Sequence, residues 1–137
     1  EKGHIVIGAE ADGRTTPHDL QLERMLRKSG GFIGAAGLTR PALSAPDRLQ
    51  LVGLTSDTPI PEGAMLVTAT GEPVLGHVTS ATGRVLGEGA VALGLLAGGR
   101  MRIGESLVAT SPTRSQSARV TVTAPLFYDA EGTRYRD

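Results

Sequence analysis

The chain has 137 residues, of which 39% are hydrophobic and 20% charged, enough for one ordinary domain and at most part of a second. Fourteen basic side chains balance fourteen acidic ones, and aromatic residues are limited to two Tyr and two Phe. Neutral charge and few stacking platforms argue against nucleic acid or an anionic membrane as a partner, and they disfavour an RNA-binding barrel. The lack of Cys excludes disulfides and Cys-based zinc sites and agrees with the cytoplasmic location that we expect.

The first third of the chain predicts short, mixed elements. Residues 3–8 (GHIVIG) form a β-branched run between glycines and predict a strand. Residues 16–19 (TPHD) have the form of a capped helix start, and residues 20–26 fit a helix or a strand. Residues 33–43 predict a short helix stopped near Pro41, and residues 44–47 read as a linker.

The rest of the chain predicts a mainly β fold. Apolar runs punctuated by glycine indicate strands at 48–55, 64–70, 73–80, 89–96, 105–110 and 118–124. About six short strands at this spacing favour a closed, six-stranded antiparallel barrel, because closure removes exposed strand edges. The longest apolar run, 90–97, is too short to cross a bilayer, and no signal segment opens the chain.

Acidic residues gather in the stretch IGAEADGRTTPHDL, at positions 7–20. Glu10 and Asp12 lie two residues apart and could share a face and bind a hard cation, but the oxygen ligands of a calcium loop are missing. We therefore favour a solvated turn followed by a capped element, with Asp19 as the capping residue.

Three other patterns give weak signals. Residues 87–92 (GEGAVA) match a dinucleotide fingerprint formally, but no βαβ unit surrounds them, so a hairpin with tight glycine geometry is favoured. His4, His18 and His77 lack the local spacing of a zinc site. The serines lack a nucleophile elbow, so the residues alone reveal no catalytic set.

Several phrases in order resemble one family, the folate-dependent aminomethyltransferases that include the glycine cleavage T-protein. The segments EKGHIVIGAEADGRTTPHDL and GGFIGAAGL resemble its acidic turn and following helix entry, and RLQLVGLTSDTPIPEGAMLV and GHVTSATGRVLGEGAVALGLL resemble its C-terminal barrel. Within the family, EKGHIVIG, IPEGAMLV and PLFYDAEG are most similar to the branch formed by α-subunits of heterotetrameric sarcosine oxidases. The resemblance covers essentially the whole chain.

The resemblance implies an enzyme as the parent protein, with the chain as its C-terminal piece and inactive alone. The parent would demethylate a secondary amine, a small-molecule substrate, and transfer the methylene unit to tetrahydrofolate. FAD, FMN and NAD would lie elsewhere in the complex, and the partners would be the remainder of the parent chain and other oxidase subunits. Residues 1–46 would end the folate-binding aminomethyltransferase domain, and residues 47–137 would form the C-terminal β-barrel.

The resemblance also suggests where folate would approach this chain. It places Glu10, Asp12, His18 and Arg24 at the rim of the folate pocket, with no catalytic or metal-binding residue in the chain. Arg24 stands where relatives usually carry Trp, which changes the packing of this segment. A non-catalytic barrel module of the same superfamily, used for packing or partner binding, is the alternative.

Overall fold

The computed structural model describes residues 2–84, 87–131 and 133–135. Six strands follow a less regular N-terminal part: β1 (Leu49–Ser56), β2 (Met65–Val67), β3 (Gly76–Gly83), β4 (Ala90–Ala97), β5 (Ser106–Ser111) and β6 (Gln116–Thr123). Two one-turn helices precede them, α1 (Ala35–Leu38) and α2 (Pro41–Ser44). Short 3-10 turns lie at Glu23–Met25, Gly99–Arg102, Pro112–Arg114 and Thr133–Tyr135.

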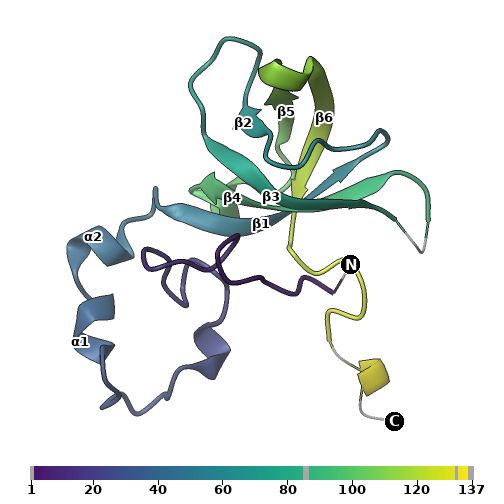
Figure 1. Cartoon of the computed structure of the whole chain (residues 1–137). Helices are drawn as coiled ribbons and strands as arrows, with labels where there is room; N and C mark the ends of the chain where they lie inside the picture. The colour runs from purple at the N-terminus through teal and green to yellow at the C-terminus, as the bar shows by residue number, and fades with distance from the viewer. Residues whose placement is uncertain (1, 85–86, 132, 136–137) are drawn as a thin grey trace.

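The six strands close into one antiparallel barrel in the order β1-β4-β3-β2-β5-β6 (Figure 1). The pairing of β6 with β1 completes the ring, so no long edge of the barrel is left open. The predicted fold class, a mainly β chain with a closed six-stranded barrel, is confirmed.

Alternating side chains fill the interior of the barrel. On β6, Ala118, Val120 and Val122 point inward and are buried, whereas Arg119 and Thr121 between them are exposed. This period of two is the pattern expected for a strand with one face in the core and one in water.

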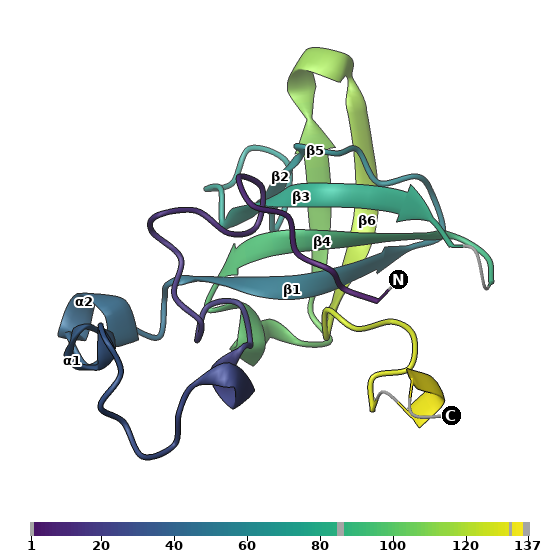
Figure 2. The same cartoon turned by 60° about the horizontal axis from the view of Figure 1, so that its bottom comes forward.

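Strand β4 departs from that pattern, because it is buried on both faces. Ala92 and Leu96 belong to the core inside the barrel, whereas Leu93 and Leu95 belong to a second apolar cluster that includes Leu51 of β1. Figure 2 shows why: the N-terminal segment, in purple, crosses β1 and β4 on the outside of the barrel. The unbroken apolar run of β4 therefore packs on both sides, in the core inside the barrel and in the cluster on its outer face.

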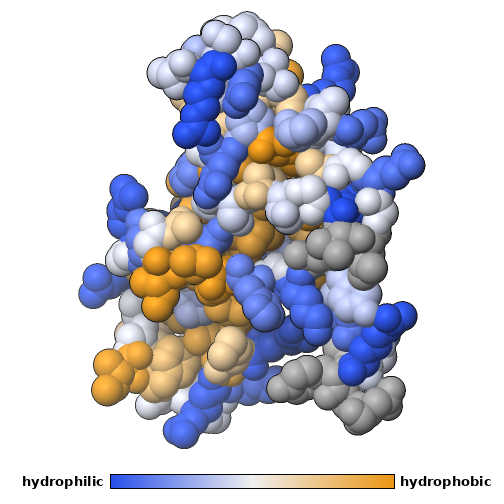
Figure 3. Space-filling model, turned by 45° about the vertical axis from the view of Figure 1, so that its right-hand side comes forward, coloured by the Kyte–Doolittle hydropathy of each residue, from blue (hydrophilic) through white to orange (hydrophobic). Residues whose placement is uncertain are grey.

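The N-terminal part has little core of its own. Of the described residues before β1, the buried ones are Glu10, Thr16, Asp19 and Leu20. Several large apolar side chains are exposed there, among them Ile7, Met25 and Ile33. On the face of the molecule in Figure 3, apolar surface gathers in the middle and at the lower left, between hydrophilic areas.

Four local expectations need correction. Residues 3–8 form no strand in the described chain, beyond a single bridge between Ile7 and Ala11. Residues 16–19 make the bonds of a helix cap but lead into a turn, and most of residues 20–26 is neither helix nor strand. The helix expected over 33–43 is split, because Pro41 begins α2 rather than ending α1.

The connection between β3 and β4 has the tight geometry expected of a glycine hairpin. Gly89 has a φ of +86°, and a Cβ there would lie 2.3 Å from the carbonyl oxygen of Ser56. Only glycine fits this approach without displacing β1. The formal dinucleotide fingerprint at 87–92 is therefore a hairpin entering β4, as predicted.

Candidate functional site

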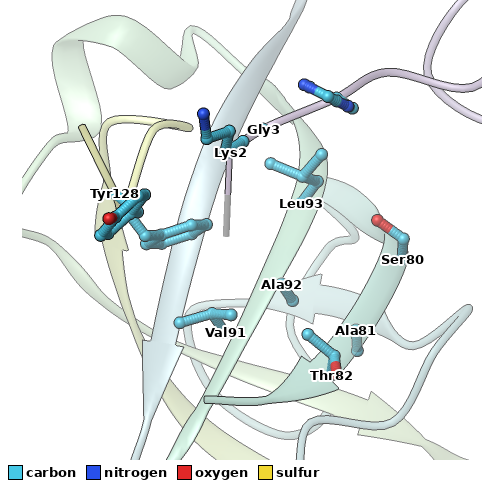
Figure 4. Close-up of a pocket in the computed structure, with 11 residues that line it drawn as sticks. Lys2, Gly3, Ser80, Ala81, Thr82, Val91, Ala92, Leu93 and Tyr128 are labelled. Atoms are coloured by element: carbon cyan, nitrogen blue, oxygen red, sulfur yellow. The ribbon is translucent and has the colours of Figure 1, made fainter. Parts of the chain in front are cut away.

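A pocket of about 640 Å³ opens on the outer face of β3 and β4, where both ends of the described chain meet the barrel (Figure 4). The N-terminal residues cross one side of it, and residues 127–128 close another. Its lining is Lys2, Gly3, His4, Ser80, Ala81, Thr82, Val91, Ala92, Leu93, Phe127 and Tyr128.

The walls of this pocket combine apolar surface with a few polar groups. Val91, Leu93 and Phe127 provide the apolar surface, while the hydroxyl of Ser80 is a hydrogen-bonding group on β3. The Lys2 ammonium lies 5.9 Å from the centroid of the Tyr128 ring, within the range of a cation–π contact. Apolar walls with a few polar groups are typical of a small-molecule pocket.

Glu10 supports the wall of this pocket from inside the protein. Its side chain is fully buried, and its two oxygens accept hydrogen bonds from the backbone N–H of Val6, at 2.7 Å, and the hydroxyl of Ser80, at 3.3 Å. Ser80 follows an irregularity in the pairing of β3 with β4, after Val78. Glu10 thus ties the N-terminal segment to the strand that lines the pocket.

Asp12 lies in an exposed turn, not in a buried site. Its Oδ1 accepts hydrogen bonds from the backbone N–H groups of Arg14 and Thr15, at 2.8 and 3.0 Å. The bond from the Arg14 backbone, with that from the Arg14 side chain, holds the pKa of Asp12 below its usual value. Asp12 lines a separate, smaller pocket of about 330 Å³ with His77 of β3.

Arg24 lines a second large pocket, of about 700 Å³, on the other side of residues 3–5. Glu23 and Arg100 also line it and form an ion pair. Burial raises the pKa of Glu23, but its hydrogen bonds and the nearby Arg100 outweigh that effect and lower it overall. His18 lies at the edge of this group, with its Nδ1 3.7 Å from Glu23 Oε1.

The four residues predicted at the folate rim therefore do not surround one cavity. Glu10 stands behind the 640 Å³ pocket, and Asp12, His18 and Arg24 line three other pockets. Their role at a folate rim stays a prediction. Apart from His4, which was considered as a zinc ligand, the residues that line the 640 Å³ pocket give no signal in the sequence. They come from segments at 2–4, 80–82, 91–93 and 127–128 that folding brings together.

An ion pair that the sequence did not reveal joins the N-terminal part to the barrel. The guanidinium of Arg48 donates to both oxygens of the buried Asp19, at 2.7–3.1 Å, and to the carbonyl oxygens of Arg14 and Ala42. Burial raises the pKa of Asp19, but the hydrogen bonds from Arg48 and Thr16 outweigh it, so the pKa lies below its usual value. Asp19 also accepts the cap bond from the Thr16 N–H, as predicted.

Within the described ranges, no group of three or more His, Asp or Glu side chains is placed to hold a metal ion. In the same residues, no helix is long and apolar enough to pass through a bilayer.

The fold and the sequence together define the family to which the chain belongs. Residues 50–129 match the family model of the glycine cleavage T-protein C-terminal barrel domain, and the chain belongs to this family. The aminomethyltransferase T of the glycine cleavage system from Bartonella henselae has a similar crystal structure, with a TM-score of 0.73 and 26% identity. The match covers 90% of this chain and 35% of that one.

More similar in sequence are α-subunits of sarcosine oxidase. The subunit from Corynebacterium sp. (strain P-1) is 36% identical over 148 residues, and that from Rhizobium meliloti (strain 1021) is 34% identical over 144. Each match covers 98% of this chain, but the chain spans only 14–15% of those proteins. The resemblance to this branch of the family, expected from the sequence, is confirmed.

Proposed function

We propose that the chain is the C-terminal part of a folate-dependent one-carbon enzyme like the sarcosine oxidase α-subunit. The parent protein would demethylate a secondary amine and transfer the methylene unit to tetrahydrofolate. The observation that carries this proposal is the similarity to α-subunits over 98% of the chain. The aminomethyltransferase-like barrel supports it further.

The 640 Å³ pocket is the place where this chain fits folate best. Leu93, Phe127 and Tyr128 would flank the flat pterin ring, and the hydroxyl of Ser80 would meet its polar edge. The described lining contains no carboxylate to position the folate nitrogens, so the chain supplies a wall of the site and not the whole of it. Tetrahydrofolate, when bound, would supply the nitrogen atoms that accept the one-carbon unit.

The chain's own contribution would be to bind one side of the folate and to exclude water from the reaction. A reactive imine is hydrolysed by water, and apolar walls at the pocket mouth would limit that loss. We place the end of the folate-binding domain at residues 1–46 and the barrel at residues 47–137. FAD, FMN and NAD, the other oxidase subunits and a cytoplasmic location belong to the same proposal.

A bulky substitution in the full parent polypeptide tests the pocket. Thr82 is an exposed residue on its wall, so Thr82→Trp fills the pocket without disturbing the barrel core. We expect tetrahydrofolate, measured by calorimetry, to bind at least about tenfold more weakly, while amine oxidation without folate continues. Thr121→Trp on β6 is the matched control, because Thr121 is exposed and lies outside this pocket.

Two results would contradict the proposal. Unchanged folate binding in Thr82→Trp would show that this pocket is not part of the folate site. A parent protein that neither oxidises amines nor binds tetrahydrofolate would favour the alternative, a barrel module used for packing or partner binding. Calorimetry of residues 1–137 alone should show negligible heat with tetrahydrofolate, because the site is only partly built from them.

A further inference from the structure

Two hydroxyl groups on β3 line the 640 Å³ pocket, and both donate their protons to the protein (Figure 4). Ser80 Oγ donates to Glu10 Oε1, 3.3 Å away, and Thr82 Oγ1 donates to the carbonyl oxygen of Gly83, 3.2 Å away. A hydroxyl has one proton to donate and two lone pairs that accept hydrogen bonds. The two hydroxyls therefore present lone pairs rather than protons to a ligand in the pocket.

The proton of Ser80 is held by Glu10. The Glu10 carboxylate is fully buried; its Oε2 accepts from the backbone N–H of Val6 at 2.7 Å, which leaves Oε1 for Ser80. The buried Asp19 is paired with Arg48, whereas the ion pairs among the described residues do not include Glu10. Because a buried carboxylate needs its hydrogen bonds and can only accept them, the Ser80 hydroxyl is fixed as a donor to Glu10.

A β-bulge brings Ser80 to the pocket wall. The partners of Val78 and Ser80 on β4 are adjacent residues, Gly94 and Leu93, so Thr79 is an extra residue in β3. Val78 is buried inside the barrel, and without the bulge the alternation of the strand would turn Ser80 inward as well. The hydroxyl of Thr79 is buried without a hydrogen-bond partner among the described residues. A bulge that redirects a side chain at such a cost is typical of strands beside functional sites.

A wall of hydrogen-bond acceptors distinguishes two oxidation states of the folate ring. In tetrahydrofolate the ring nitrogens N5 and N8 carry hydrogens, whereas in folic acid the same nitrogens have only lone pairs. Ser80 Oγ can accept a hydrogen bond from a ring N–H of the reduced form, but in the oxidised form it meets another acceptor. A site built around such a bond rejects a ligand that lacks it, because the polar group of the site is left without a partner.

We propose that Glu10 is a positioning residue: by holding the proton of Ser80, it makes the 640 Å³ pocket select tetrahydrofolate over folic acid. Glu10 does not line the pocket and acts through Ser80, which does. The proposal rests on the proposed function, since it needs folate in this pocket.

The dissociation constant of folic acid divided by that of tetrahydrofolate, measured by calorimetry on the intact parent protein, tests this proposal. We expect the unchanged protein to bind folic acid at least about tenfold more weakly than tetrahydrofolate. Ser80→Ala removes the acceptor and should lower this ratio by about tenfold. Glu10→Gln should lower it further. The amide oxygen stays with the Val6 N–H and the amide N–H group donates to Ser80, so the Ser80 proton turns into the pocket.

Two control variants should keep the ratio of the unchanged protein. Ser80→Thr retains the hydroxyl, and Glu88→Gln removes an exposed carboxylate that lies outside this pocket. If Glu10→Gln does not fold, the comparison of Ser80→Ala with Ser80→Thr decides by the same ratio.

Three results would overturn the proposal or what it rests on. A purely structural role of Glu10 would weaken the binding of both ligands alike and leave the ratio unchanged, which would overturn the proposal. An unchanged protein that binds both ligands equally well would also overturn it, with the proposed function intact. An unchanged protein that binds neither ligand would instead overturn the proposed function itself, so the two failures are distinguishable.

Discussion

At the scale of single residues, the Arg48–Asp19 pair shows what burial does to a carboxylate. Asp19 is 3% exposed, and every one of its described partners donates a hydrogen bond to it. Removing one member of such a pair leaves the other charge without compensation. We expect Asp19→Asn to lower the free energy of unfolding by about 2 kcal/mol, less than for a fully buried pair because Arg48 keeps a 21% exposed side chain.

The Arg48–Asp19 pair also predicts how the free energy of unfolding depends on pH. Because the pKa of Asp19 is lowered on folding, its contribution is present above the unfolded pKa and is lost as pH falls through the folded pKa. Urea unfolding at pH 7 and near pH 3 should therefore show a smaller acid-induced loss in Asp19→Asn than in the unchanged chain. Asp47→Asn, at an exposed neighbour of Arg48, is the control, and an equal effect in both variants would contradict this account.

At the scale of elements, the strands could be predicted and the N-terminal part could not. The alternation of β6 and the glycine punctuation of the hairpins are local patterns, so the sequence alone indicates them. The 16–19 cap forms its bonds, yet no helix follows, because Gln21 takes a φ of +59° and its neighbours Leu20 and Leu22 pack on the outer cluster. The partner of Asp19 lies 29 residues away, and no local pattern encodes such a distance.

The candidate site likewise depends on contacts between distant segments, which the sequence does not reveal. Its walls come from four separate segments. In the acidic stretch, Asp12 is an exposed turn residue, whereas Glu10 is a buried carboxylate that hydrogen-bonds Ser80 at the pocket wall. The resemblance to a family leads to the proposed function, and the folded chain forms the pocket. Neither the spacing of the acidic residues nor the composition distinguishes Glu10 from Asp12, because burial is a property of the folded chain.

Adjacent residues of β4 allow the two cores to be compared. Leu96 is fully buried inside the barrel, and Leu95 is 6% exposed under the irregular N-terminal segment. We expect Leu96→Ala to cost about 3–4 kcal/mol and Leu95→Ala about 2 kcal/mol, because the looser cover over Leu95 can settle into the space left behind. Urea unfolding of the two variants checks the order, and a larger loss for Leu95→Ala would show that the outer cluster is packed as rigidly as the barrel.

At the scale of the whole molecule, the barrel is closed but its outer face is not finished by its own strands. Leu51, Leu93 and Leu95 form an apolar patch that, among the described residues, is covered by those before β1 and after β6. The barrel strands alone would leave this patch exposed, so the outer face is completed by the segments before and after the barrel. An apolar interface within the chain thus joins the barrel to the segments before and after it.

That asymmetry predicts opposite effects of one substitution in two contexts. Residues 47–137 alone would expose Leu93 and Leu95, and we expect them to self-associate, as seen by sedimentation at rising concentration. The double change Leu93→Ser with Leu95→Ser should restore a monomer in that shortened chain, because it removes the patch. In the 137-residue chain the same change should destabilise by at least about 4 kcal/mol in urea unfolding, since both side chains are buried there. A shortened chain that stays monomeric without the serines would mean that the barrel buries this face by itself, and the outer cluster would then be incidental to the fold.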